Sequence, residues 1–224
     1  LCSSAQLSCV PFTSLICNMA ATMYYFPAAG RGETIRLIAA AGGIELLAGD
    51  PATQDVKEYG SPSGTPILQH GELKMSQSTA IESYMSLLAF PDLTPDQRAK
   101  DMQFCSIKED CLAGIAKYIF TPELKEKAAE DLPKHFSKWY PVIEKLVPAD
   151  GFINGLAYPT AADLAILNMC KAFLPFAVGY KIGALDLAAS YPKMMALTDR
   201  VAKAPKIEAY LAKSETMTAN PFGL

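Results

Sequence analysis

Short apolar runs separated by turn residues occupy the first third of the chain, and longer apolar patterns at helical spacing occupy the rest. The short runs predict strands over residues 23–26, 44–48, 66–69 and 72–75, the last two as a hairpin across His70-Gly71. Helical spacing predicts helices over 33–41 and 76–88, with a short, loosely held helix over 54–59. The order strand, helix, strand, short helix, strand, strand, helix is that of a thioredoxin-like domain.

The character of the chain changes at residues 90–95, a linker with two prolines in six positions. The pattern beyond it is helical, with helices expected over 97–120, 122–146, 160–173, 191–202 and 205–213. Pro133 and Pro141 are expected to interrupt the second of these. The sequence Thr160 to Asp163 has the form of a capping box, a structural feature. We therefore expect an α/β N-terminal thioredoxin-like domain over 19–91 and an all-α C-terminal helical bundle over 94–224.

The charge and the apolar runs of the chain exclude some classes of partner. The 224 residues carry 20 Lys and Arg against 23 Asp and Glu, and no basic run exceeds two residues. That balance argues against nucleic acid as a partner. No uncharged apolar stretch from Arg31 onward is long enough to span a bilayer, and no lipidation signal is present. The expectation is a cytoplasmic protein without a membrane or nucleic-acid partner.

Residues 1–30 carry no charged side chain, and the chain starts with Leu1. They lack the positive region of a secretory signal and the arginines of a transit peptide. Residues 1–18 are therefore expected to be a fragment of a leader or of translated upstream sequence, with no assigned role. The later cysteines form no CxxC pair and have no metal-ligand spacing with the two histidines. We expect buried free thiols in a reducing compartment and no metal.

Three segments in order carry a resemblance to a known family. They are residues 25–33 (YFPAAGRGE), residues 64–68 (GTPIL) followed by 77–81 (QSTAI), and residues 159–165 (PTAADLA). Together they resemble the cytosolic glutathione transferases, closest to the sigma-like group, over about residues 23–211. The resemblance implies the two-domain glutathione transferase architecture and a homodimer. It also implies detoxification chemistry in which glutathione is the co-substrate and is joined to small hydrophobic electrophiles.

The resemblance makes Tyr25 the catalytic candidate. A free cysteine thiol has a pKa of about 8.5, so most glutathione is protonated at neutral pH. A phenol O–H directed at the sulfur favours the thiolate, and Arg31 could add a positive field or order the tyrosine loop. The alternative is that Tyr25 is a core aromatic on a strand. Tyr24 is a rival that points to the opposite face of the strand.

Glutathione contacts are implied at Lys57, Thr65, Pro66, Gln77 and Ser78. We expect a cis bond between Thr65 and Pro66, which would turn the Thr65 backbone toward an extended peptide; the alternative is a trans proline at the start of an edge strand. Gln77 and Ser78 begin a helix, whose N-terminus attracts the γ-glutamyl carboxylate, although Ser78 could serve only as a cap. Lys57 would meet the glycine carboxylate, but it could also be solvated surface.

Two positions depart from the family pattern. Thr53 stands where a tryptophan is expected, which removes one donor from the glycyl end. An ungapped register places Cys105, with Asp101 one turn earlier, where many members have an aspartate that reaches across the dimer to the glutamyl amine. These departures weaken the expectation of full activity, and two alternatives stay open: a glutathione-dependent isomerase or peroxidase, or a non-catalytic structural or assembly subunit.

The same resemblance implies the positions of a substrate pocket and of a dimer interface. An apolar electrophile pocket is expected between the loop 27–30 and the long helix near residues 104–118. The dimer interface is expected on the helix after Ser76 and on the long helix after Gln97.

Overall fold

The computed structural model describes residues 19–62 and 64–224. The expectation for residues 1–18 lies outside the described residues. Within them the strands are β1 (Ala21–Tyr24), β2 (Leu46–Gly49), β3 (Ile67–His70) and β4 (Leu73–Ser76). They form one sheet in the order β2-β1-β3-β4, with β1 parallel to β2 and antiparallel to β3.

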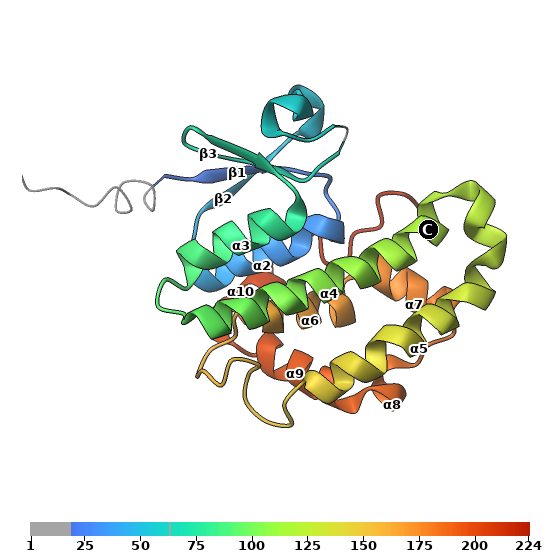
Figure 1. The fold of residues 1–224 in the computed structure, drawn as a ribbon. Coiled ribbons are helices and arrows are strands. Elements are labelled where there is room, and N and C mark those ends of the chain that lie inside the picture. The colour runs from blue at the N-terminus through green and yellow to red at the C-terminus, as the bar shows by residue number, and fades with distance from the viewer. Residues whose placement is uncertain (1–18, 63) are drawn as a thin grey trace, which may run out of the picture.

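Two helices cover one face of this sheet. Helix α2 (Glu33–Gly42) joins β1 to β2, and α3 (Ser78–Ala89) follows β4. Both lie between the sheet and the helical half of the molecule, where α2 packs on α6 and α10 and α3 packs on α4 (Figure 1). Three short 3-10 segments complete this half: η1 (Gly30–Gly32), η2 (Pro51–Thr53) and η3 (Val56–Tyr59). This arrangement confirms the α/β half of the predicted fold.

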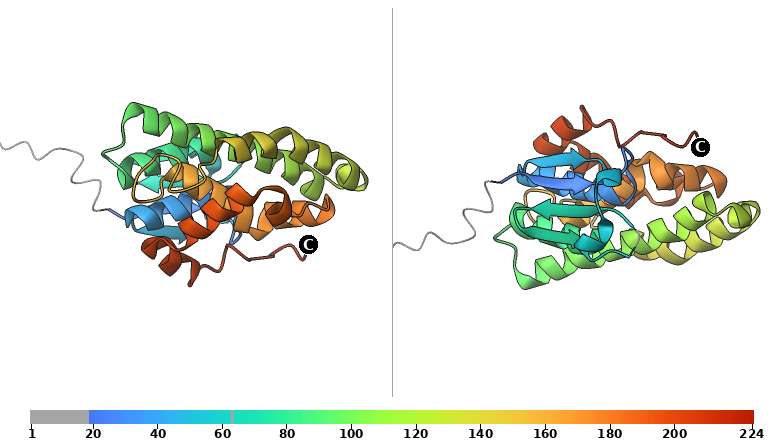
Figure 2. Two further views of the ribbon diagram at one scale, coloured as in Figure 1. Left: turned by 90° about the horizontal axis from the view of Figure 1, so that it is seen from below. Right: turned by 90° about the horizontal axis from the view of Figure 1, so that it is seen from above.

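The rest of the chain is helical. Its elements are α4 (Pro95–Phe120), η4 (Pro122–Lys127), α5 (Ala128–Leu146), α6 (Ala161–Lys171), the π-helical turn η5 (Phe173–Ala177), α7 (Val178–Ile182), α8 (Leu187–Ser190), α9 (Pro192–Ala202) and α10 (Pro205–Leu211). Helices α4 and α5 run side by side in both views of Figure 2. Every strand of the described residues ends by Ser76, so the predicted fold class is confirmed. The domain limits 19–91 and 94–224 stay a prediction.

Helix α5 corrects one sequence expectation. It runs unbroken from Ala128 to Leu146 with Pro133 and Pro141 inside it. Both prolines are exposed, so water can reach the carbonyl groups that lose their helical partners. On the opposite face, the helix buries Leu132, Phe136, Tyr140 and Ile143. The packing of this apolar stripe keeps the segment helical although two backbone hydrogen bonds are missing.

Helix α6 forms the centre of the helical core. Its residues from Ala161 to Met169 are all buried. The predicted capping box is confirmed: Thr160 and Asp163 exchange hydrogen bonds between side chain and backbone at its start. Asp163 also accepts from the backbone N–H of Ile153 at 2.8 Å, which fixes the preceding loop to the helix.

Within residues 19–62 and 64–224, no single helix is both long and apolar enough to cross a bilayer. Helix α6 and the segment Phe173–Ile182 meet the length and composition criteria only as a pair, and they are bent by 57° relative to each other.

Candidate active site

Tyr25 lies immediately after β1, which ends at Tyr24 and not at Phe26 as the pattern predicted. Its hydroxyl oxygen accepts a hydrogen bond of 3.1 Å from the backbone N–H of Arg31. Gly30 has a φ of +45°, and a Cβ there would collide with the same hydroxyl group. A Cβ at Gly32 would lie 2.6 Å from the ring. The two glycines therefore let the loop close around the edge of the phenol.

Tyr24 has different neighbours. Its ring packs edge-on against Tyr59 at a centroid distance of 6.1 Å, while Tyr25 packs against Phe26. The two adjacent tyrosines thus belong to different environments, and Tyr25 is the one that lines a cavity.

Electrostatics keep Tyr25 protonated at neutral pH. Burial raises the pKa of its phenol above the ordinary value. The Arg31 N–H and the charges of Arg31 and Arg36 act in the opposite direction but do not overcome burial. A neutral phenol retains its O–H, so Tyr25 can donate a hydrogen bond to an anion placed beside it.

Arg36 holds the loop that follows Tyr25. Its guanidinium group donates to the carbonyl oxygens of Ala28 at 3.0 Å and of Phe26 at 3.2 Å. Its Cζ atom lies 5.9 Å from the centre of the Tyr25 ring. The same group pairs with Glu33, whose side chain is fully buried. One arginine of α2 thus fixes both the loop backbone and the face of the ring.

Glu33 extends this network to the C-terminal segment. Its carboxylate accepts a 2.5 Å hydrogen bond from Tyr210 and a 2.6 Å bond from Thr216. A buried carboxylate is stable only when its oxygens are satisfied in this way. The start of α2 is therefore tied to the chain beyond α10.

Arg31, Ser78 and Glu109 form a second cluster. The Nε atom of Arg31 lies 2.6 Å from Oε1 of Glu109, and the Ser78 hydroxyl donates to Oε2 at 3.3 Å. Beneath them, Lys108 and Glu82 form a fully buried ion pair of 2.6 Å. The structure thus brings three of the residues selected from sequence, Tyr25, Arg31 and Ser78, to one place.

The start of α3 is strained. Gln77 precedes the helix with φ +72° and ψ 109°, a conformation that residues other than glycine rarely adopt. Such outliers cluster at functional sites. Gln77 is exposed while Ser78 is buried. The Thr65–Pro66 peptide bond is cis, as the sequence analysis predicted.

Lys57 stands apart from this group. It is exposed on η3, and within the described residues no hydrogen bond joins it to Tyr25, Arg31 or Ser78. Thr53, where a tryptophan was expected, donates its hydroxyl hydrogen to the Asp50 carbonyl oxygen at 2.7 Å. It therefore closes a local turn.

The two positions selected on α4 for an acidic contact both face inward. Asp101 is 3 % exposed and accepts hydrogen bonds from Asn154 and Thr160 in its own chain. Burial raises the pKa of its carboxyl group, against those bonds. Cys105 is buried, and burial raises the pKa of its thiol well above the ordinary value. Both residues hold the helical core together.

One acidic residue of α4 that the sequence motifs did not mark lies near Ser78, and a second follows it in the chain. Glu109 contacts Ser78 directly, and Asp110, the next residue on α4, is exposed. They lie about one helical turn beyond Cys105. Aligning the long helix with the family pattern one turn further along would have selected them. The two adjacent acidic residues in the sequence were the signal for that alignment.

An apolar cavity of about 220 Å³ opens beside Tyr25. Its other walls come from Ala28 and Gly30 of the loop and from Leu112 and Ala116 of α4. The cavity therefore lies where the sequence analysis expected one. Phe120 and Phe222 also line it, with their rings edge-to-face at 5.5 Å. The C-terminal segment thus forms part of the wall, a feature that the sequence did not indicate.

The free cysteines and metal ligands of the described residues add no further site. Cys105 and Cys111 are buried and Cys170 is half-buried, and none of the three is in a disulfide. No group of three His, Cys, Asp or Glu side chains in residues 19–62 and 64–224 is arranged to hold a metal ion.

Comparison with known proteins identifies the class. Residues 109–214 match the family model described as glutathione S-transferase, C-terminal domain. A glutathione S-transferase of Plasmodium falciparum (isolate 3D7) is 32% identical over 172 residues, which are 66% of this chain and 77% of the relative. Glutathione S-transferase A4 of Mus musculus is 25% identical over 214 residues, 90% of this chain and 92% of the relative.

Solved structures agree in fold. Rat hPGDS complexed with a quinoline superposes with a TM-score of 0.69 at 21% identity, over 87% of this chain and 97% of that one. The glutathione S-transferase from Ascaris lumbricoides gives a TM-score of 0.69 at 20% identity, over 91% and 100%. Fold and sequence agree on one class of protein. The chain belongs to the glutathione S-transferase family.

Proposed function

We propose that this protein joins the thiolate of glutathione to small hydrophobic electrophiles and that the Tyr25 hydroxyl activates the thiol. One observation carries the proposal: Tyr25 keeps its O–H proton and lines an apolar cavity, and Arg31 in the same wall is linked through Glu109 to Ser78 at the start of α3. A donor held at that point favours the thiolate over the thiol, because it stabilises the negative charge. The electrophile would enter the 220 Å³ cavity next to the sulfur.

Glutathione would lie beside the loop that precedes β3 and the start of α3. Ser78 and the strained Gln77 support binding of the γ-glutamyl carboxylate, since the first N–H groups of a helix are free to bind an anion. Thr65, next to Pro66, would pair with the peptide backbone. Lys57 would meet the glycine carboxylate as an exposed, movable ammonium group.

The protein would act as a homodimer through α3 and α4, in the manner of the sigma-like group. Glu109 is already paired with Arg31 in its own chain. Asp110 is exposed beside it, so Asp110 is our candidate to reach the glutamyl amine of glutathione bound to a second subunit. The free thiols support a reducing, cytoplasmic setting.

Two measurements test the proposal. The first is retention on glutathione resin with elution by free glutathione. The second is the conjugation of glutathione to 1-chloro-2,4-dinitrobenzene. We expect both to be positive. Retention without conjugation, combined with turnover of a hydroperoxide or an isomerisable substrate, would replace conjugation by peroxidase or isomerase chemistry. Failure to bind the resin and to react would place the chain with non-catalytic members of the family. Sedimentation that gives only a monomer at micromolar concentration would contradict the dimer.

A further inference from the structure

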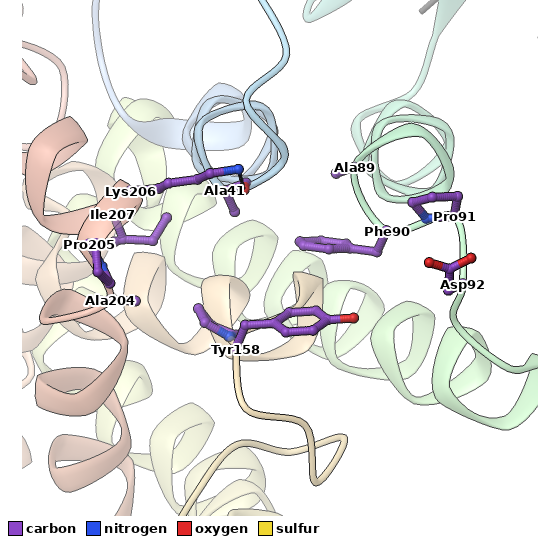
Figure 3. Close-up of a pocket in the computed structure, with 11 residues that line it drawn as sticks. Ala41, Ala89, Phe90, Pro91, Asp92, Tyr158, Ala204, Pro205, Lys206 and Ile207 are labelled. Atoms are coloured by element: carbon purple, nitrogen blue, oxygen red, sulfur yellow. Dashed lines mark hydrogen bonds between the residues drawn. The ribbon is translucent and has the colours of Figure 1, made fainter. Parts of the chain in front are cut away.

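The two ends of α3 have different surroundings. Its last residue, Ala89, lines an apolar cavity together with Phe90 and Tyr158 (Figure 3). Its first residue, Ser78, lies beside charged side chains that come from α4 and η1. The first N–H groups of a helix have no partner within the helix, and they attract a negative charge. The start of α3 is therefore the end of this helix that favours an anion.

The side chain at the N-cap position does not cap this helix. Gln77 occupies that position, and its side chain makes no capping hydrogen bond. Ser78 is buried, and its hydroxyl donates to Oε2 of Glu109 at 3.3 Å. A serine hydroxyl has only one proton to donate. The anion that lies at the start of α3 is thus a carboxylate of the protein itself.

Both oxygens of Glu109 are held by cations. Oε1 lies 2.6 Å from Nε of Arg31, and Oε2, which accepts from Ser78, also lies 3.7 Å from Nζ of Lys108. Lys108 is fixed in turn, because it is fully buried and pairs with Glu82 at 2.6 Å. In this arrangement the charge of Glu109 neutralises the cations that would otherwise attract an anion from solution.

The contact between Glu109 and Ser78 is nevertheless easy to open. The side chain of Glu109 is 23% exposed and that of Arg31 is 39% exposed. An ion pair that water reaches contributes little to stability. The hydrogen bond to Ser78, at 3.3 Å, is longer than ordinary O–H···O bonds. An incoming carboxylate that forms a shorter bond can therefore replace Glu109 at modest cost.

We propose that Glu109 is an internal competitor of glutathione. The inference rests on the proposed function, which places the γ-glutamyl carboxylate at Ser78. Ser78 cannot donate its one proton to two carboxylates, and two carboxylates beside one hydroxyl repel each other. Binding of glutathione therefore moves Glu109 away from Ser78, and the free energy that this movement costs lowers the affinity.

The test is isothermal titration calorimetry of the full chain with glutathione. Glu109→Gln keeps the shape of the side chain and removes its charge. We expect this variant to bind glutathione about tenfold more tightly, because the repulsion is gone and Arg31 and Lys108 are no longer neutralised. Glu72→Gln makes the same change at an exposed residue of the turn between β3 and β4, and it should leave the affinity unchanged.

A second peptide separates competition from a general loosening of the site. The peptide γ-aminobutyryl-cysteinyl-glycine is glutathione without its α-carboxylate, and it retains the amino group. It leaves Glu109 at Ser78, so Glu109→Gln should gain no affinity for it. Binding of this peptide to the variant also shows that the site is still formed. A variant that had only lost packing would change its affinity for both peptides alike.

The possible results separate this inference from the function on which it rests. The inference is overturned if the wild type binds glutathione and Glu109→Gln binds it no more tightly, or if the gain is the same for both peptides. The proposed function stands in either case. It fails, and the inference with it, if neither protein binds glutathione.

Discussion

The Oε2 atom of Glu33 lies 3.0 Å from Nη1 of Arg36, and the same nitrogen donates to the loop carbonyl of Ala28. Arg36 is therefore a positioning residue for Tyr25. Lysine at this position would keep the charge but could not bind Glu33 and the loop carbonyls together. We expect Arg36→Lys to lower kcat about tenfold and to raise the pKa of bound glutathione. KM for glutathione should change little. Steady-state rates and thiolate absorbance across pH give these values.

Thr216→Val is the control for that variant. It removes one hydrogen bond to Glu33 and leaves the loop after Tyr25 untouched. Loss of one hydrogen bond to a charged carboxylate costs about 1.5 to 3 kcal/mol, which lowers Tm by about 3 to 12 °C in a chain of this size. Activity should stay at the wild-type level. If Arg36→Lys also loses only thermal stability, Arg36 has no positioning role.

Tyr25→Phe should reduce turnover far more than glutathione affinity. The ring fills the same space in both proteins, and the variant loses the O–H donor together with the oxygen that accepts from the Arg31 N–H. Removing one donor to an anion typically lowers the rate by about 10² to 10³. The thiol pKa should rise toward its free value, so the pH–rate profile moves upward. Tyr24→Phe, against Tyr59, should change neither. Wild-type turnover with an unchanged thiolate titration in Tyr25→Phe would make Tyr25 a packing residue.

Asp110→Asn should raise KM for glutathione about tenfold, the equivalent of one lost charge-assisted hydrogen bond. A sharper readout uses a glutathione analogue that lacks the glutamyl amine. The wild type should discriminate against this analogue, and Asp110→Asn should not. Glu109→Gln keeps Asp110, so it should still discriminate. If Asp110→Asn also retains the discrimination, the amine is recognised elsewhere.

The raised pKa of Asp163 leads us to expect a specific pH dependence of the free energy of unfolding. Burial raises its carboxyl pKa from 3.8 to about 6, although backbone N–H groups of Ile153 and Thr160 oppose the shift. Between those two values the folded protein binds more protons at this site than the unfolded chain. The contribution of Asp163 to the free energy of unfolding therefore falls as pH rises from about 4 to 6, by about 2 to 3 kcal/mol.

Urea unfolding of the wild type and of Asp163→Asn from pH 4 to 6.5 isolates this effect, because both proteins keep Asp101. The wild type should lose stability relative to the variant as pH rises. A difference that grows in favour of the wild type would mean that the two backbone hydrogen bonds outweigh the cost of burying the charge.

The sequence was sufficient for much of the fold because local signals agreed with the packing. The helix expected over 33–41 ends within one residue of that limit, where Gly43 caps it at φ +72°. The capping box at Thr160 begins α6 as expected. Tyr25 was expected within a strand, but the strand ends one residue earlier. Arg36, on α2, fixes the loop after Tyr25 by donating hydrogen bonds to its carbonyl oxygens. No short sequence pattern predicts that contact.

The site was only partly accessible from sequence for the same reason. Tyr25, Arg31 and Ser78 are marked by short motifs. The approach of Glu109 to Arg31 spans 78 positions along the chain. The contact of Glu33 with Thr216 spans 183. Such pairs depend on how α4 and the C-terminal segment dock on the α/β half, and this docking follows from the shape of the core and not from spacing along the chain.

The two exposed prolines of α5 bear on the order in which the molecule assembles. A helix with two prolines in its interior is a poor folding nucleus. Each proline is about 3 kcal/mol less favourable than alanine inside a helix. The buried stripe from Leu132 to Ile143 offsets this only when its neighbours are present. We therefore expect helix α5 to form late, on a surface already built by α4, α7 and α9, as a product of the folded core and not as its nucleus.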